Sequence, residues 1–210
     1  MSEHPLHEIG PGAADEAASV LAEAFAAYPT TAWFFEPSPL ERAEASTALM
    51  RFFVTARWLR GEMVLGVRVD GRLAAVALAS FPGRGAAPPE LADARERLWS
   101  FVGAGARERY EAYGRALEPL LEHADGVHVN VLGVRPEHRG RGLARALLDH
   151  VHVRASTSPC AGVSLVTEDP ANLPFYRHLG FEVTGSTEVA PGITAWALLR
   201  PSDPLDVDRT

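Results

Sequence analysis

The segment that most restricts the fold of this chain runs from an apolar strand through a glycine- and arginine-rich turn into an amphipathic helix. Residues 127–134 alternate valine with other residues, which predicts a strand, and residues 140–154 carry apolar side chains at helical spacing. A strand that passes directly into a helix is typical of sheets whose faces are covered by helices. The segment therefore predicts an α/β or α+β fold around one mixed sheet.

The rest of the chain supplies more helices and strands of ordinary length. Asp70-Gly71 is a dipeptide that suits a two-residue hairpin turn between two apolar runs. No repeat or linker divides the chain, so we expect one domain over 1–200 and a flexible tail over 201–210. We expect helices at 13–28, where Pro29 ends the helix, and at 40–59, 90–101, 106–122, 140–154 and 173–179, an aromatic loop at 30–37, and strands at 64–69, 73–81, 127–134, 162–167, 181–189 and 194–199.

Composition excludes several classes of function. The formal net charge of -7 gives no basic surface for nucleic acid or an anionic membrane, so we expect neither partner. No apolar run approaches the roughly 18 residues of a membrane-spanning helix. The single Cys160 forms no internal disulfide, and the first residues lack a signal peptide, which favours a cytoplasmic location. No histidines or thiols have metal-ligand spacing, so no metal is expected.

The turn before the helix has the composition of an anion site. Gly140, Gly142 and Ala144 leave the backbone N–H groups of the first helical turn open to a phosphate. Three arginines surround them: Arg139, Arg141 and Arg145. A Walker loop is excluded because the chain has no lysine, and a dinucleotide motif is disfavoured because an arginine stands where the third glycine belongs. A pyrophosphate is the expected ligand, and a surface helix with solvated arginines is the alternative.

Two linked motifs resemble the GNAT superfamily of N-acetyltransferases. They are Arg139-x-x-Gly142-x-Ala144 after a strand, and the later stretch from Asn172 to Tyr176. Within the superfamily the chain is similar to the branch that includes puromycin N-acetyltransferase. The resemblance implies a GNAT-like single domain, with a mixed twisted sheet, splayed central strands and helices on both faces. It also implies acetyl-CoA as co-substrate and no metal.

The resemblance assigns a role to the strand and turn. The pantetheine arm would pair with the strand, and the diphosphate would lie at the helix start. Asn172 would hold the arm, although capping its own helix is equally plausible. The implied cofactor-binding residues are Leu132, Gly133, Val134, Arg139, Gly140, Arg141, Gly142, Leu143, Ala144, Arg145 and Asn172.

The catalytic residues follow from what acetyl transfer needs. Tyr176 would protonate the departing thiolate, with a plain core tyrosine as the alternative. His128 is the expected general base, on the strand face that alternation gives to His128, Asn130 and Leu132, because an imidazole accepts protons near neutral pH. Glu168 is the second candidate, and an enzyme that uses only ordered water is the third.

The acceptor side is the least specified. Trp33, Phe34 and Phe35 are candidates for the floor of a substrate pocket, with core packing as the alternative. The expected function is direct transfer of an acetyl group to the primary amine of a small molecule, antibiotic-like or polyamine-like, because no nucleophile is placed for a covalent relay. A non-catalytic acyl-CoA sensor and an enzyme that acetylates protein N-termini or lysines are the alternatives. A homodimer is left open.

Overall fold

The computed structural model describes residues 5–36, 42–83, 86–121, 126–157 and 160–202 of the 210-residue chain. They form a seven-stranded sheet in the order β1-β2-β3-β4-β5-β7-β6. The strands are β1 Leu6–Glu8, β2 Met63–Val69, β3 Arg72–Ser80, β4 Val127–Val134, β5 Gly162–Thr167, β6 Glu182–Ala190 and β7 Ile193–Pro201. The α-helices are α1 Ala14–Ala24, α2 Pro29–Phe35, α3 Arg42–Leu59, α4 Pro89–Val102, α5 Ala104–Leu121, α6 Leu143–Ser156 and α7 Leu173–His178.

The sheet is mixed, as the sequence predicts. β4 and β5 run parallel, and the other described strand pairs are antiparallel. The predicted hairpin is β2 and β3, and Asp70 and Gly71 between them have φ angles of 50° and 80°. Those positive angles match the twist of the flanking strands. The chain therefore has the expected α/β architecture with one sheet.

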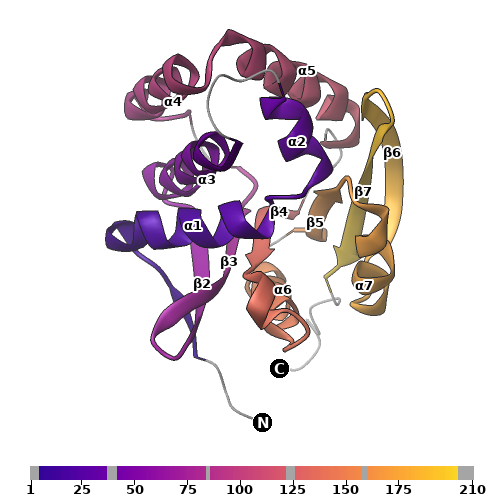
Figure 1. Cartoon of the computed structure of the whole chain (residues 1–210). Helices are drawn as coiled ribbons and strands as arrows, with labels where there is room; N and C mark the ends of the chain where they lie inside the picture. Colours follow the sequence, from indigo (N-terminus) through magenta and orange to yellow (C-terminus); the bar gives the residue numbers. More distant parts are fainter. Residues whose placement is uncertain (1–4, 37–41, 84–85, 122–125, 158–159, 203–210) are drawn as a thin grey trace, which may run out of the picture.

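Helices cover both faces of the sheet. On one face, Leu147 and Val151 of α6 pack in a core cluster with Val129 and Leu165. On the other, side chains of α1 and α3 pack against β2, β3 and β4. Figure 1 shows α2, α4 and α5 together at one end of the molecule, and α6 and α7 at the other. The central strands β4 and β5 lie between these two groups.

The structure corrects the prediction near Pro29. The first helix ends at Ala24, not at residue 28, and most of the expected aromatic loop is the helix α2. Proline suits the first turn of a helix because it needs no N–H partner there and its φ is already helical. Pro29 therefore starts a helix after a short break. Residue 37, the last of the expected loop, and residues 40–41, the start of the expected helix, lie outside the described residues.

Two further boundaries differ from the prediction. Strand β1 was not predicted, because three residues are too few to show a pattern, and it forms by pairing with β2. At the other end of the chain Pro201 is the last residue of β7, and the Ser202 N–H donates to the Ala161 carbonyl at 3.0 Å. The rest of the predicted flexible tail, 203–210, lies outside the described residues.

Candidate functional site

Strands β4 and β5 separate halfway along their length. Their last paired residues are Val129 and Leu165. Beyond that pair, β4 stays with β3 as far as Val134, and β5 stays with β7 as far as Thr167. Beyond this point the facing edges of β4 and β5 are no longer hydrogen-bonded to each other. A cavity of about 590 Å³ is lined by both strands there, which confirms the predicted splay.

A β-bulge in β4 sets which side chains face the cavity. β3 pairs with Val129 and then with Val131 while advancing by a single residue, so Asn130 is the extra residue of the bulge. The bulge resets the alternation of side chains. Val131 packs in the cluster under α1, whereas Leu132 packs against the cluster under α6. The prediction that Leu132 shares a face with His128 is therefore wrong.

The turn before α6 leaves its backbone open. Gly140 and Gly142 have φ angles of 74° and 80°, and a Cβ atom added to either would meet no atom within 4 Å. The first backbone hydrogen bond onto Gly142 comes from the Ala146 N–H at 3.0 Å, so the N–H groups before it have no acceptor within α6. Open N–H groups at a helix start attract anions. The turn fits a diphosphate.

The predicted coenzyme residues separate into groups. Gly140, Arg141 and Arg145 are exposed around the turn, and Leu143 is 3% exposed in the core, so only its backbone is available. Those that line the cavity are Leu132, Gly133, Val134, Arg139, Ala144 and Asn172.

Two of these lining residues connect β4 and the turn to α1. A Cβ atom at Gly133 would lie 2.9 Å from both Ala24 and Leu21, so α1 packs directly on this strand. The Arg139 guanidinium donates to the Ala24 carbonyl at 3.1 Å. The end of α1 therefore holds the edge of β4 and the turn in a fixed relation.

Tyr176 lies in α7 and lines the cavity with 9% of its surface exposed. Burial and the nearby Glu168 carboxylate raise the pKa of Tyr176 to about 12, so its phenol stays protonated. Asn172 occupies the N-cap position of α7 but makes no capping hydrogen bond. Its amide instead donates to Thr167 Oγ1 at 3.1 Å. The side chain is thus fixed at the end of β5, on the cavity wall.

A buried carboxylate follows β5. Glu168 is 6% exposed, and the Tyr113 hydroxyl of α5 donates to its Oε1 at 2.6 Å. The Glu168 N–H donates to the Tyr28 hydroxyl at 2.9 Å. Burial raises the pKa of Glu168, and hydrogen bonds from Tyr113 and Tyr28 oppose that rise. Sequence reasoning missed both tyrosines, because nothing in their spacing marks them as neighbours of residue 168.

His128 lies in the same cavity, at a different wall. Its Nδ1 is 3.0 Å from Ser164 Oγ. Burial and the charge of Arg57 lower the pKa of His128 to about 4, so the expected value near neutrality is wrong. Arg57 Nη1 donates to Asn130 Oδ1 at 2.9 Å and is 2.8 Å from Glu62 Oε2. His128 is neutral at pH 7 but is a weak base.

The predicted aromatic floor contributes one ring to the cavity. Phe34 lines it, with ring centroids 5.6 Å from Tyr110 and 5.4 Å from Tyr113. Trp33 and Phe35 are not among the lining residues, and both pack in the cluster formed by α2 to α5. The sequence does not mark Tyr110 and Tyr113 as pocket residues, because most of the residues around them in α5 are polar or small.

The described residues contain no candidate metal centre. Among them, no three His, Cys, Asp or Glu side chains are grouped so as to hold a metal ion. No helix in the same ranges is long and apolar enough to cross a membrane. The site consists of the cavity, the turn before α6 and the tyrosine and glutamate side chains around them.

Known proteins are similar to this chain in fold. Residues 107–197 match the acetyltransferase (GNAT) domain. A Corynebacterium glutamicum protein described as "histone acetyltransferase HPA2 and related acetyltransferase" is similar with a TM-score of 0.68 and 21% identity, covering 96% of this chain and 98% of that chain. The polyamine N acetyltransferase of Drosophila melanogaster gives 0.63 and 17%, covering 93% and 99%. The arylalkylamine N-acetyltransferase 2 of Aedes aegypti gives 0.66 and 14%, covering 95% and 99%.

Proposed function

Because residues 107–197 match an acetyltransferase (GNAT) domain and the chain has the GNAT fold, we propose that the protein moves an acetyl group from acetyl-CoA directly to the primary amine of a small molecule. The observation that carries the proposal is one shared cavity. Its lining includes Arg139 and Ala144 beside the phosphate turn, Tyr176, and the carboxylate of Glu168. The coenzyme, the proton donor and the acceptor amine can therefore all lie in one cavity.

The coenzyme end supports binding of acetyl-CoA. The edge of β4 from residue 131 to Val134 has lost its partner on β5, so its backbone groups can pair with the amides of a pantetheine arm. The open turn at Gly140 and Gly142 suits the diphosphate. In both places the proposed contacts to the coenzyme are made by backbone groups of the protein rather than by side chains.

The chemistry of transfer suits the residues at the cavity. Tyr176 stays protonated and can donate to the sulfur as the carbon–sulfur bond breaks. A covalent relay would need a nucleophile beside the thioester, and Cys160 does not line the cavity. Its thiol donates instead to the Ala155 carbonyl at 3.3 Å. Direct attack by the amine is the simpler path.

The acceptor end favours a small molecule. Phe34, Tyr110 and Tyr113 of α2 and α5 wall the cavity with rings, which bury a compact ligand well. The Drosophila and Aedes proteins named above are acetyltransferases of polyamines and arylalkylamines. A polyamine-like or antibiotic-like amine, the latter as in the puromycin branch, is the acceptor we propose. A cytoplasmic setting, a homodimer and the lack of nucleic-acid or membrane partners belong to the same proposal.

Two measurements on the full chain test this function. Calorimetry with acetyl-CoA measures binding, and a free-thiol assay measures turnover with spermidine, agmatine, tyramine and a peptide with a free N-terminus. We expect binding and thiol release that depends on a small amine. Binding without release for any amine would instead indicate a sensor. Faster release with the peptide would indicate a protein acetyltransferase, and no binding would overturn the coenzyme site.

A further inference from the structure

The cavity wall contains a buried carboxylate without a cation. Within the described ranges, no arginine or histidine forms an ion pair with Glu168, although the side chain is almost fully buried. The other acidic residue that lines the cavity is Asp169, and its carboxylate accepts a hydrogen bond from the Ala171 N–H at 2.9 Å. A buried charge is costly unless it is paired. When Glu168 is ionised, no cation among the described residues compensates its charge.

On the premise of the proposed function, we propose that Glu168 binds the ammonium group of the acceptor and removes its proton, while Tyr113 positions the carboxylate. Tyr113 donates to Oε1 at 2.6 Å, which fixes the orientation of the carboxylate from α5. A carboxylate has about four acceptor sites, so the tyrosine contacts leave room for an ammonium. The primary amine would thus be held where β5 ends, beside the splay.

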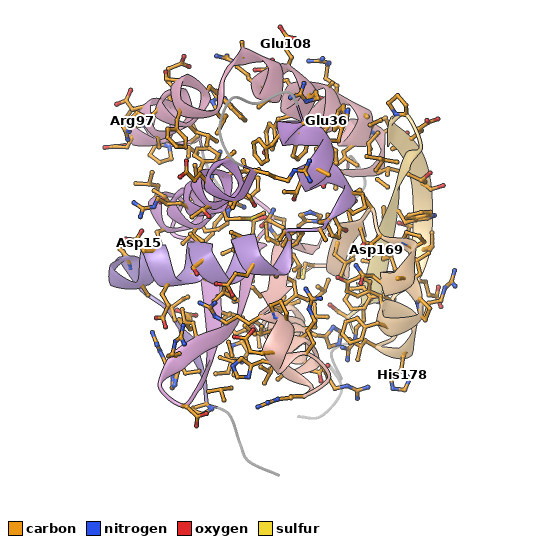
Figure 2. The ribbon with its side chains drawn as sticks, in the orientation of Figure 1. Asp15, Glu36, Arg97, Glu108, Asp169 and His178 are labelled. Atoms are coloured by element: carbon orange, nitrogen blue, oxygen red, sulfur yellow. The ribbon has the colours of Figure 1, made fainter. Side chains whose placement is uncertain are left out.

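The groups that face Glu168 are neutral at physiological pH. They are the phenols of Tyr28, Tyr113 and Tyr176, which come from three different segments. The neighbouring Asp169 is engaged locally, because its carboxylate accepts from the Ala171 N–H at 2.9 Å. Asp169 marks the position of this site in Figure 2. A cation that enters the cavity would therefore be attracted to the Glu168 carboxylate, which the neutral Tyr113 hydroxyl orients.

The surroundings of His128 disfavour the same role for its side chain. Burial and the charge of Arg57, which is itself paired with Glu62, lower the pKa of His128 to about 4, so the imidazole takes up a proton poorly at neutral pH. Glu168, in contrast, lies close enough to Tyr176 to raise the pKa of that phenol. An amine held at Glu168 is therefore near the proposed proton donor.

The proton balance closes with these groups. The acceptor enters as R–NH3⁺ and gives one proton to Glu168, which yields a neutral amine with a free lone pair. The nitrogen attacks the thioester carbon, the carbon–nitrogen bond forms, and the carbon–sulfur bond breaks. Tyr176 gives its proton to sulfur and recovers one from the nitrogen, which becomes the amide. Glu168 releases its proton to solvent, so each turnover yields an amide, a thiol and one proton.

The ring wall describes the body of the acceptor. The Phe34 ring centroid lies 5.6 Å from that of Tyr110 and 5.4 Å from that of Tyr113, beside the carboxylate to which Tyr113 donates. Aromatic faces attract an ammonium and bury an apolar carbon skeleton. A primary amine whose cationic group is next to a flat or apolar body therefore fits best, and tyramine is a suitable probe.

Glu168→Gln tests the inference because the amide can still accept from Tyr113 but carries no charge. We expect kcat/KM for tyramine to fall about a hundredfold, and the acidic limb of its pH profile to disappear, as for loss of a general base. The dissociation constant of acetyl-CoA should change less than twofold. Glu36→Gln, the same change at an exposed glutamate at the end of α2, should leave both quantities unaltered.

A second substrate separates binding from proton removal. Trifluoroethylamine is mainly neutral at pH 7.5, so Glu168→Gln should reduce its kcat/KM much less than that of tyramine. An equal kcat/KM and an intact acidic limb for tyramine in the variant would overturn the inference. Loss of acetyl-CoA binding by the unmodified protein would overturn the proposed function instead, so the two failures are distinct.

Tyr113→Phe keeps the inference testable if Glu168→Gln does not fold. The phenol of Tyr113 lowers the pKa of Glu168, so removing it raises that pKa. The acidic limb of kcat/KM should therefore move to higher pH, and activity at pH 7.5 should fall about tenfold for a lost hydrogen bond to a charged group. An acidic limb that stays in place would contradict the role of Glu168.

Discussion

The two ends of the cavity are built in different ways. The proposed coenzyme end comes from one stretch of chain, in which β4 leads through Gly140 and Gly142 into α6, and it presents backbone groups. The proposed acceptor end joins Tyr28, Tyr113 and Glu168 from segments that are far apart in sequence, and it presents side chains. Backbone recognition constrains local sequence strongly, whereas a side-chain pocket can be assembled from many sequences. The reaction is therefore easier to infer from this chain than its substrate.

The largest expected effect is at the coenzyme end. Gly142→Leu places a side chain in the open space of the turn, where it would exclude the diphosphate. Loss of two charge-assisted hydrogen bonds predicts about 4 kcal/mol, or about a thousandfold weaker acetyl-CoA binding by calorimetry.

The control for this variant is Gly71→Leu. Gly71 has the same φ of 80° and the same open surroundings, but it lies in the β2–β3 turn. Both variants force a left-handed backbone and should lose about 1–2 kcal/mol of stability. Only Gly142→Leu should lose the coenzyme. Equal affinity in the two variants would mean that the diphosphate does not lie at the α6 turn.

Tyr176→Phe addresses the point where the two ends meet. Removing the phenol leaves the ring contact with Phe181 but removes the proton donor, so kcat should fall about a hundredfold, as for loss of a general acid. The affinity for acetyl-CoA should stay within twofold of its original value. A weaker affinity with unchanged kcat would make Tyr176 a binding residue and would extend the coenzyme end to α7.

The smallest effect on activity is expected at His128. Because its pKa is about 4, His128 is neutral across the assay range, and His128→Asn should retain the acidic limb of the pH profile with kcat within about threefold. A lost limb would return the base role to His128. The acceptor end would then face Arg57 rather than Glu168.

The same histidine has a larger effect on stability at low pH. Its folded-state pKa of about 4 lies below the value of 6.5 without burial, so the unfolded chain binds more protons between these two pH values. Stability should therefore fall as pH drops from 6.5 toward 4, and His128→Asn should lose less. Urea unfolding at pH 7 and at pH 4.5 measures this difference, and equal losses would contradict the buried, neutral imidazole.

The parts of the fold that sequence predicts are those set by local backbone needs. The hairpin at Asp70 and Gly71 and the turn at Gly142 each require positive φ angles that few residues adopt. The bulge at Asn130 could not be predicted, because it exists only in the pairing of β4 with β3. The helix α2 was missed because proline can end one helix and begin another.

Burial explains what sequence could not show at the site. The low pKa of His128 follows from its burial and from the nearby charge of Arg57. Neither cause can be read from the sequence of β4. The sequence does not favour Glu168 over His128, because Tyr113, which orients the Glu168 carboxylate, lies 55 residues away. Distances of this kind are set by the completed sheet and its helices.

A crystal structure of the acetyl-CoA complex tests the central claim most directly. The pantetheine arm should lie along β4 between residue 131 and Val134, in the gap where β5 departs, with the diphosphate on the N–H groups that follow Gly142. The thioester should lie beside Tyr176. Coenzyme bound at another surface, with the gap between β4 and β5 closed, would contradict the account.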